Sequence, residues 1–203
     1  MSLSLEAVLD GLGAALAYPR DGYQASLIEC RDSLEGGEPE AAAAVGAFCE
    51  ATADLNETEL EELYTRTFDL NPVCTPEVGW HIYGEQYRRG RFLVQARDLL
   101  SVVGIEERGE LPDHLMSLLP AVARIQPADA ALFAGTYLVP AVDKMLAGLA
   151  EKANPYEQIL QAIRLVLMTF ATEPAQVEGP FEDDDLVRIG TPQSPPTQKG
   201  AIS

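Results

Sequence analysis

Residue types that commonly do chemistry are scarce in this 203-residue sequence. It contains only two histidines, His81 and His114, and three widely spaced cysteines. The histidines with scattered carboxylates could bind a metal, and Cys74 with His114 could act as a nucleophile and its base. Neither spacing is diagnostic, and the sequence has no phosphate-loop, HExxH or GxSxG pattern. We therefore expect a protein that is not an enzyme and holds no metal or cofactor of its own.

A segment rich in aromatic residues and arginine, between Tyr64 and Leu115, has the composition of a contact surface. Two interpretations stay open for its aromatic residues. Tyr64, Phe68 and Phe92 recur at helical spacing, which also suits a buried core. Trp80 and Tyr83 follow a proline-broken loop, where amphipathic rings often line pockets. The segment therefore predicts either a binding surface or part of the core.

Helices must position these residues, because apolar residues recur at helical spacing through most of the chain and no alternating run indicates a strand. Asn56 and Glu59 have the spacing of a capping box at a helix start. Gly104 is the expected end of a long helix that follows Gly84, and Pro140 should kink or split another helix. We expect an all-α bundle of about seven to nine helices. The expected helical segments are 5–16, 22–34, 39–53, 57–68, 85–103 and 155–170, and two further helices start near 111 and 127.

Charge is strongly acidic and unevenly spread. The net charge is −18, and residues 1–62 alone carry −12. Such acidity disfavours nucleic acid and anionic membranes as partners and favours a basic peptide, although solubility is the simpler explanation. No uninterrupted apolar run approaches the roughly 20 residues of a membrane span, and the first residues do not resemble a secretory signal. We expect a cytoplasmic protein with reduced, idle cysteines.

The composition changes after residue 172. An acidic run at 182–185 is followed by several prolines among Ser, Thr and Gln. Such a segment cannot bury enough apolar surface to order itself. We predict one helical domain over 1–172 and a flexible, acidic, proline-rich tail over 173–203.

Three short elements resemble those of the NarJ chaperones, within the wider TorD and DmsD group of redox-enzyme maturation proteins. The stretch 62–70 (ELYTRTFDL) is similar to their Tyr…Thr-Phe-Asp-Leu element, and 81–90 (HIYGEQYRRG) to their His…Gly…Arg-Gly element. The stretch 110–115 (ELPDHL) resembles their Glu-Leu-Pro-Asp-His-Leu element. All three occur in the family's order, over roughly residues 60–120.

The resemblance implies an all-α, cytoplasmic assembly chaperone without catalytic activity. Its partner would be the N-terminal segment of the apo catalytic subunit of a molybdoenzyme, a nitrate reductase or a relative. The chaperone would hold that segment while the molybdenum cofactor is inserted, before complex assembly or export. Monomers and dimers are both compatible with the resemblance. The alternative is a general helical peptide-binding adaptor without a molybdoenzyme client.

Positions matching the family's elements supply the candidate peptide-binding residues. Asp113, expected to be exposed at a helix start, would accept a hydrogen bond from a peptide arginine, and His114 would tune it with pH. In the alternative interpretation, Asp113 only places a favourable negative charge at a helix N-terminus, and His114 is a structural histidine with hydrogen bonds inside the protein. The complete candidate set is Tyr64, Phe68, Trp80, His81, Tyr83, Glu85, Arg89, Asp113, His114 and Leu115.

Overall fold

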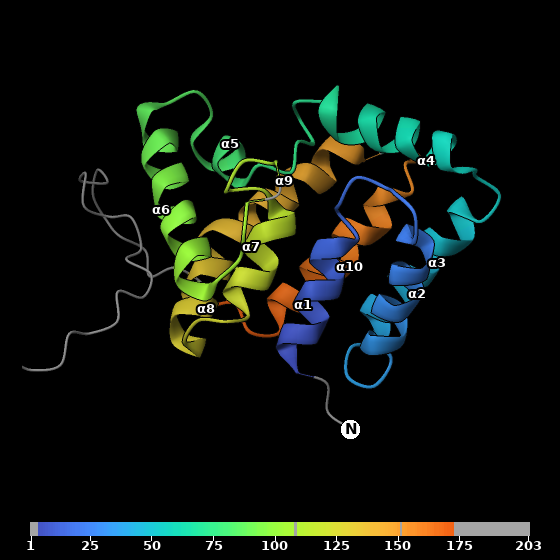
Figure 1. Cartoon of the computed structure of the whole chain (residues 1–203), viewed down its shortest axis with the longest axis horizontal. Coiled ribbons are helices and arrows are strands. Elements are labelled where there is room, and N and C mark those ends of the chain that lie inside the picture. Colours follow the sequence, from blue (N-terminus) through green and yellow to red (C-terminus); the bar gives the residue numbers. More distant parts are fainter. Residues whose placement is uncertain (1–3, 108, 151, 173–203) are drawn as a thin grey trace, which may run out of the picture.

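The computed structural model describes residues 4–107, 109–150 and 152–172. In these residues ten α-helical and two π-helical segments join into nine continuous helices, and no strand forms, which confirms the all-α prediction (Figure 1). The segments are α1 Leu5–Ala14, α2 Tyr23–Leu34, α3 Pro39–Thr52, α4 Glu57–Tyr64, η1 Thr65–Asp69, α5 Val78–Tyr83, α6 Tyr87–Val103, α7 Leu115–Val122, α8 Pro127–Phe133, η2 Ala134–Leu138, α9 Val139–Leu149 and α10 Tyr156–Met168. The predicted tail over 173–203 lies outside the described residues.

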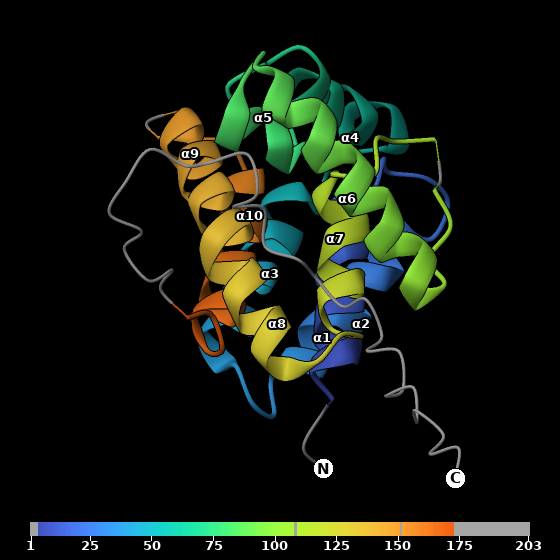
Figure 2. The same cartoon turned by 90° about the vertical axis from the view of Figure 1, so that its left-hand side faces the viewer.

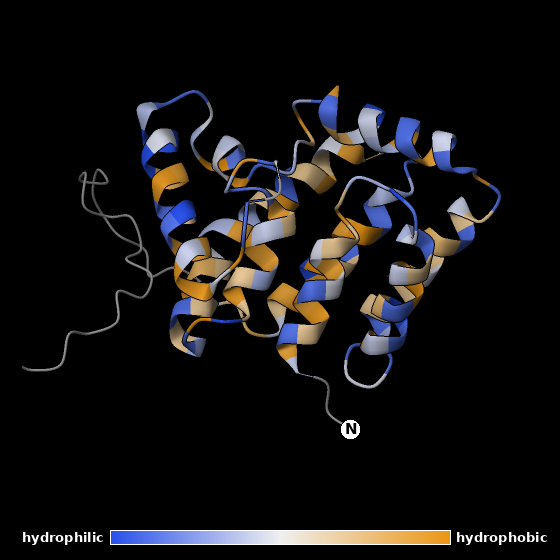
Figure 3. Cartoon of the chain, in the orientation of Figure 1, coloured by the Kyte–Doolittle hydropathy of each residue, from blue (hydrophilic) through white to orange (hydrophobic). Residues whose placement is uncertain are grey.

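Local sequence signals account for several helix ends. The Asn56 side chain accepts from the Glu59 N–H, and the Glu59 carboxylate accepts from the Asn56 N–H, so the predicted capping box is confirmed. Gly104 ends α6 in the left-handed conformation, also as predicted. Figure 3 shows hydrophobic and hydrophilic residues alternating along α1 and α6, as expected for helices with one buried face.

The helices form two halves joined by α1 and α10. α10 packs against α3 and α9, while α1 packs against α2 and α7. Each half has an aromatic cluster in its core. The first aromatic cluster consists of Tyr18, Phe48, Tyr64, Phe68 and Tyr156, and the second consists of Tyr83, Phe92, Phe133 and Tyr137.

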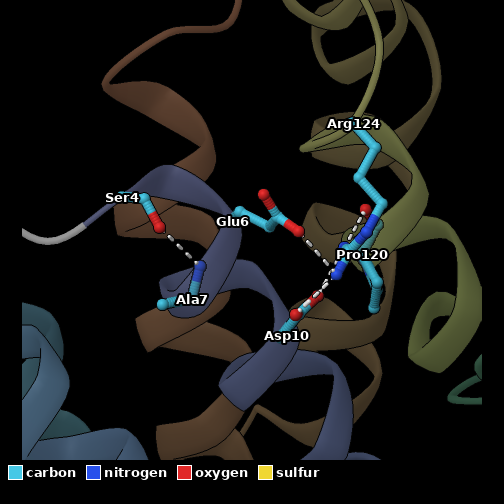
Figure 4. A network of polar contacts seen from close by, with 6 residues as sticks. All are labelled: Ser4, Glu6, Ala7, Asp10, Pro120 and Arg124. Carbon is cyan, nitrogen blue, oxygen red and sulfur yellow. Dashed lines mark hydrogen bonds and ion pairs between the residues drawn. The ribbon is translucent and has the colours of Figure 1, made fainter.

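An ion-pair network also fastens α1 to α7 (Figure 4). The Arg124 guanidinium donates to both carboxylate oxygens of Asp10, at 2.6 and 2.7 Å, and to the Pro120 carbonyl at 2.8 Å. Glu6 lies 2.9 Å from the same guanidinium. Arg124 therefore bridges two helices that are more than 100 residues apart in the sequence.

Pro140 does not split its helix, which was one of the two outcomes predicted for it. The segments α8, η2 and α9 run as one helix, and the π-helical turn η2 ends just before Pro140, which lies in the first turn of α9. The wider π turn accommodates a ring that would clash in a regular α-helix. The sequence-based expectation overlooked this way of accommodating a proline.

The same helix, Pro127–Leu149, is the only one among the described residues that is long and apolar enough to cross a membrane. Length and composition alone are weak grounds, because the core helix of a soluble protein also meets them. Its fully buried residues Phe133, Leu138 and Met145 belong to the common core. The helix also packs against α10 and α5. These contacts are those of a core helix.

Two expectations around the candidate site were wrong. No helix was expected between Pro76 and Gly84, but Val78–Tyr83 forms α5. The helix after α6 was expected to begin near Pro112, but this helix, α7, begins at Leu115 with His114 as its N-cap. Both helix starts depend on contacts between segments about 35 residues apart, which local sequence patterns do not reveal.

Candidate functional site

A short pairing of two loops creates the candidate site. The Val78 N–H donates to the Asp113 carbonyl at 3.0 Å, and the Leu115 N–H donates to the Pro76 carbonyl at 3.0 Å. Glu77 and His114 form the isolated antiparallel bridge between them. This pairing places the start of α5 beside the start of α7, and so brings two of the three sequence elements together.

Asp113 lies at this junction and is completely buried, with 0% of its surface exposed. Its Oδ2 accepts from the Gly79 N–H at 2.9 Å, so it caps α5 and not the helix that follows it in sequence. Its Oδ1 is buried without a hydrogen-bond partner. Burial raises the pKa of the Asp113 carboxyl, while the Gly79 bond and nearby Arg89 oppose that shift. The expectation that Asp113 is exposed was therefore wrong.

His114 and His81 are both held by backbone groups. His114 Nδ1 accepts from the Met116 N–H at 3.0 Å and thereby caps α7. Burial lowers the pKa of His114 to about 4, so its imidazole is neutral near pH 7. His81 Nε2 lies 2.7 Å from the Thr75 carbonyl and donates to it, and burial lowers the pKa of His81 as well. Both side chains thus have structural hydrogen bonds.

Trp80, Tyr83 and Arg89 are half-buried beside the junction. The Arg89 guanidinium carbon lies 5.3 Å from the centroid of the Trp80 ring, a cation–π distance. Arg89 Nε is buried without a hydrogen-bond partner. Glu85 is exposed in the short connection between α5 and α6. Arg89 therefore packs against the half-buried Trp80 ring, and its charge acts on the buried Asp113 carboxyl.

Tyr64, Phe68 and Leu115 belong to the core, with exposed fractions of 4%, 1% and 0%. The Tyr64 hydroxyl donates to the Leu16 carbonyl at 3.2 Å, and its ring packs edge-on against Phe68. Tyr64 nevertheless lies near the junction. Its pKa is raised first by burial and then by the negative charges of Glu110 and Asp69, with a further contribution from Glu77.

Three acidic residues that sequence reasoning did not single out therefore surround the junction: Asp69, Glu77 and Glu110. Glu77 is half-buried, and its pKa is raised by burial and by the charges of Asp113 and Glu110. Asp69 and Glu110 are exposed. A signal for them was available, because Asp69 and Glu110 lie inside two of the three family-like elements.

Large apolar side chains are exposed next to these acids. Leu70 follows Asp69 and is 75% exposed, and Leu111 follows Glu110 and is 42% exposed. We call the surface formed by Asp69, Leu70, Glu77, Glu110 and Leu111 the acidic–apolar surface. Its residues come from the end of η1, from the position before α5 and from the connection between α6 and α7.

A separate cleft of about 440 Å³ lies between the α1–α2 connection and the start of α4. Arg20, Tyr23, Leu55 and Leu60 are among its lining residues. None of the ten predicted site residues lines it. The cleft is therefore distinct from the acidic–apolar surface.

The described residues offer little for catalysis or metal binding. They contain no group of three or more His, Cys, Asp or Glu side chains placed to hold a metal ion. Burial raises the pKa of the Cys74 thiol to about 12, which is the opposite of what a nucleophile needs. Cys74 Sγ contacts the Met145 carbonyl, and His114 is already bonded to Met116.

Comparison with known proteins identifies the family of the chain. No protein of curated function matches the chain. The family described as nitrate reductase delta subunit matches residues 35–156, which is more than half of the chain and includes every candidate site residue. The chain therefore belongs to the nitrate reductase delta subunit family.

Proposed function

We propose that this protein is a cytoplasmic assembly chaperone that binds the N-terminal peptide of an apo molybdoenzyme catalytic subunit. Membership in the nitrate reductase delta subunit family supports a general role in molybdoenzyme maturation, since members of this family are chaperones. The bound peptide would stay competent for molybdenum cofactor insertion before complex assembly or export. The client is a nitrate reductase or a related respiratory oxidoreductase.

The acidic–apolar surface carries the proposal. Leu70 and Leu111 supply exposed apolar area that a helical peptide can cover with its own apolar face. Asp69, Glu77 and Glu110 surround that area with negative charge, which attracts basic residues and speeds association. An amphipathic peptide with arginine or lysine fits both features.

The candidate residues divide into two roles around this surface. Trp80, Tyr83, Glu85 and Arg89 are half-buried or exposed and can touch a peptide directly. The buried members act as positioning residues beneath it, because they hold the starts of α5 and α7 and the end of α4. These positioning residues are Tyr64, Phe68, His81, Asp113, His114 and Leu115.

Calorimetry with synthetic N-terminal peptides of molybdoenzyme catalytic subunits tests the proposal. We expect one peptide to bind at nanomolar to micromolar Kd and to bind more weakly in high salt. The double variant Glu77→Gln/Glu110→Gln removes two of the surface charges while keeping side-chain shape. It should raise the Kd roughly tenfold, at about 0.7 kcal/mol for each charge pair.

A matched control uses the same charge change elsewhere. Glu29 and Glu50 are exposed on α2 and α3, away from the junction. Glu29→Gln/Glu50→Gln should therefore leave the Kd nearly unchanged. Equal weakening by both double variants would show that only net charge matters and would remove the acidic–apolar surface as the site.

A comparison of different peptides distinguishes the proposed molybdoenzyme chaperone from the alternative, a general peptide-binding adaptor. Binding to unrelated basic amphipathic peptides, with no preference for molybdoenzyme leaders, would favour a general peptide-binding adaptor. Absence of binding to any molybdoenzyme peptide would contradict the proposed chaperone function.

A further inference from the structure

Basic residues are concentrated in one place on this acidic chain. The sequence has only 14 lysines and arginines, and Arg88, Arg89 and Arg91 lie within four positions at the start of α6. Arg88 and Arg91 lie near the Tyr83 hydroxyl, where their charges partly oppose the rise in its pKa that burial causes. Tyr87, on the same turn, is 86% exposed.

The outward part of α6 therefore combines positive charge with exposed apolar area. Val94 follows Tyr87 at helical spacing and is 57% exposed. We call the surface formed by Tyr87, Arg88, Arg91 and Val94 the arginine face. Elsewhere the chain is dominated by negative charge, so this face is the favourable location for an acidic segment.

The last described residues after α10 lie against the α8–η2–α9 helix, which packs against α6. The Thr172 N–H donates to the Ala131 carbonyl at 3.0 Å. A side chain at Gly135 would overlap the carbonyl group of Thr172, so only glycine allows the two backbones to approach this closely. Figure 2 shows the end of the described chain beside α8.

The arginine face lies within reach of that point. Phe92 of α6 packs on Phe133 and Tyr137 of the α8–η2–α9 helix, with ring centroids 6.2 and 5.0 Å apart. Nine residues separate Thr172 from the acidic run at 182–185. Nine extended residues span about 30 Å, whereas α6, with 17 residues, is only about 25 Å long.

We propose that residues 173–203 fold back onto the arginine face, with the acidic run 182–185 against Arg88 and Arg91. Phe181 and Leu186 flank that run and supply apolar side chains for Tyr87 and Val94. Charge complementarity and chain reach both favour this occupant. An acidic partner would then reach α6 only by displacing the tail. This inference does not depend on the proposed peptide binding at the acidic–apolar surface.

Paramagnetic relaxation enhancement on the full chain tests the docking. A nitroxide is attached at Thr191→Cys in a Cys49→Ala background, since Cys30 and Cys74 are buried. Backbone amides of residues 87–95 should lose most of their peak height. The loss should fade in about 1 M salt, where the screening length is only about 3 Å.

Charge reversal makes the test specific. Arg88→Glu/Arg91→Glu should abolish the peak loss on α6, and changing residues 182–185 to lysine in that variant should restore it. The control Arg66→Glu/Lys152→Glu, at two exposed positions elsewhere, should leave the peak loss intact. The measurement at low and high salt uses the labelled protein with its native residues in α6. The test therefore does not depend on whether the Arg88→Glu/Arg91→Glu variant folds.

Three results would overturn the proposal. The first is peak loss spread evenly over the molecule or centred on another surface. The second is peak loss on α6 that survives both high salt and charge reversal. The third is peak loss that arises only between molecules, seen when nitroxide-labelled protein is mixed with unlabelled, isotope-enriched protein.

Discussion

Asp113 and His114 are adjacent in sequence but serve different helices. Asp113 accepts from Gly79 and caps α5, while His114 accepts from Met116 and caps α7. Both are buried, so each polar group that loses its partner is left without water to replace it. Loss of either cap should therefore lower the stability of the protein.

The first prediction concerns Asp113. Asp113→Ala should lower the free energy of unfolding by about 1–3 kcal/mol, because the buried Gly79 N–H loses its acceptor. Asp113→Asn retains an oxygen acceptor and removes the cost of burying a charge, so it should recover most of that loss. Urea unfolding of the two variants measures the difference. An Asp113→Ala protein as stable as wild type would show that this hydrogen bond contributes nothing.

The second prediction concerns pH and His114. The unfolded histidine has a pKa near 6.5, and in the folded protein the pKa is about 4. Below pH 6.5 the proton therefore binds the unfolded chain more strongly, and stability falls as the pH drops from about 6.5 towards 4. The full loss is about 3 kcal/mol as an upper estimate. Protonation also removes the Nδ1 acceptor that caps α7.

His114→Asn isolates this contribution, because asparagine is a good N-cap and does not titrate. Its free energy of unfolding should vary less between pH 6.5 and 4.5 than that of wild type. Part of the dependence should remain, since the pKa of His81 is lowered too. Identical pH dependence in the two proteins would exclude His114 as its source.

Helix α5 depends on the elements around it. It has only six residues, too few for a stable isolated helix, and its own N-cap residue makes no side-chain hydrogen bond. Asp113 caps its start, and the Lys144 ammonium donates to the His81 carbonyl near its end. Its geometry is therefore set by the segment that leads into α7 and by α9.

Paired glycine substitutions test that dependence at the element scale. At Gly79 a Cβ would lie 2.7 Å from Asp113 Oδ2 and 2.9 Å from Phe92, so Gly79→Ala should destabilise the protein by about 1–3 kcal/mol. Gly90 in α6 has no neighbour within 4 Å of its Cβ position. Gly90→Ala should stabilise the protein by about 0.5–1 kcal/mol through helix propensity alone. Thermal unfolding of both variants provides the comparison, and similar effects at the two sites would contradict close packing at Gly79.

On the scale of the whole molecule, α1 and α10 hold the two halves together. Close packing between α1 and α7 is possible because Gly13 has no side chain, since a Cβ there would lie 2.8 Å from the Met116 carbonyl. The Arg124 network adds a polar connection at the same interface. Relative motion of the halves would therefore have to disturb both contacts.

A double-mutant cycle tests the polar connection. Arg124→Ala and Asp10→Ala should be coupled by about 0.5–1 kcal/mol, because the pair is bidentate and Arg124 is only 27% exposed. The more exposed Arg97–Glu107 pair serves as the control and should show a smaller coupling. Chemical unfolding of the four proteins of each cycle gives the energies. Equal coupling in both cycles would contradict a special role for Arg124.

Local patterns in the sequence determined the fold class and much of the helix layout. Helical periodicity predicted the helices, and the Asn56 capping box and the Gly104 C-cap predicted two of their ends, because each signal lies within a few residues of the structure it specifies. The three motif elements also indicated the family that the match over 35–156 shows.

Only the tertiary structure decided where the motif residues lie and what they contact. α5, the start of α7 and the burial of Asp113 all depend on pairing between residues 76–79 and 113–115. The acidic–apolar surface likewise combines Asp69, Glu77 and Glu110 from three distant segments. A single sequence carries local propensity and periodicity, but burial and long-range hydrogen bonds are set by packing between distant segments. The sequence therefore pointed to a set of candidate residues, and the packed structure determined which of them are buried and which are exposed.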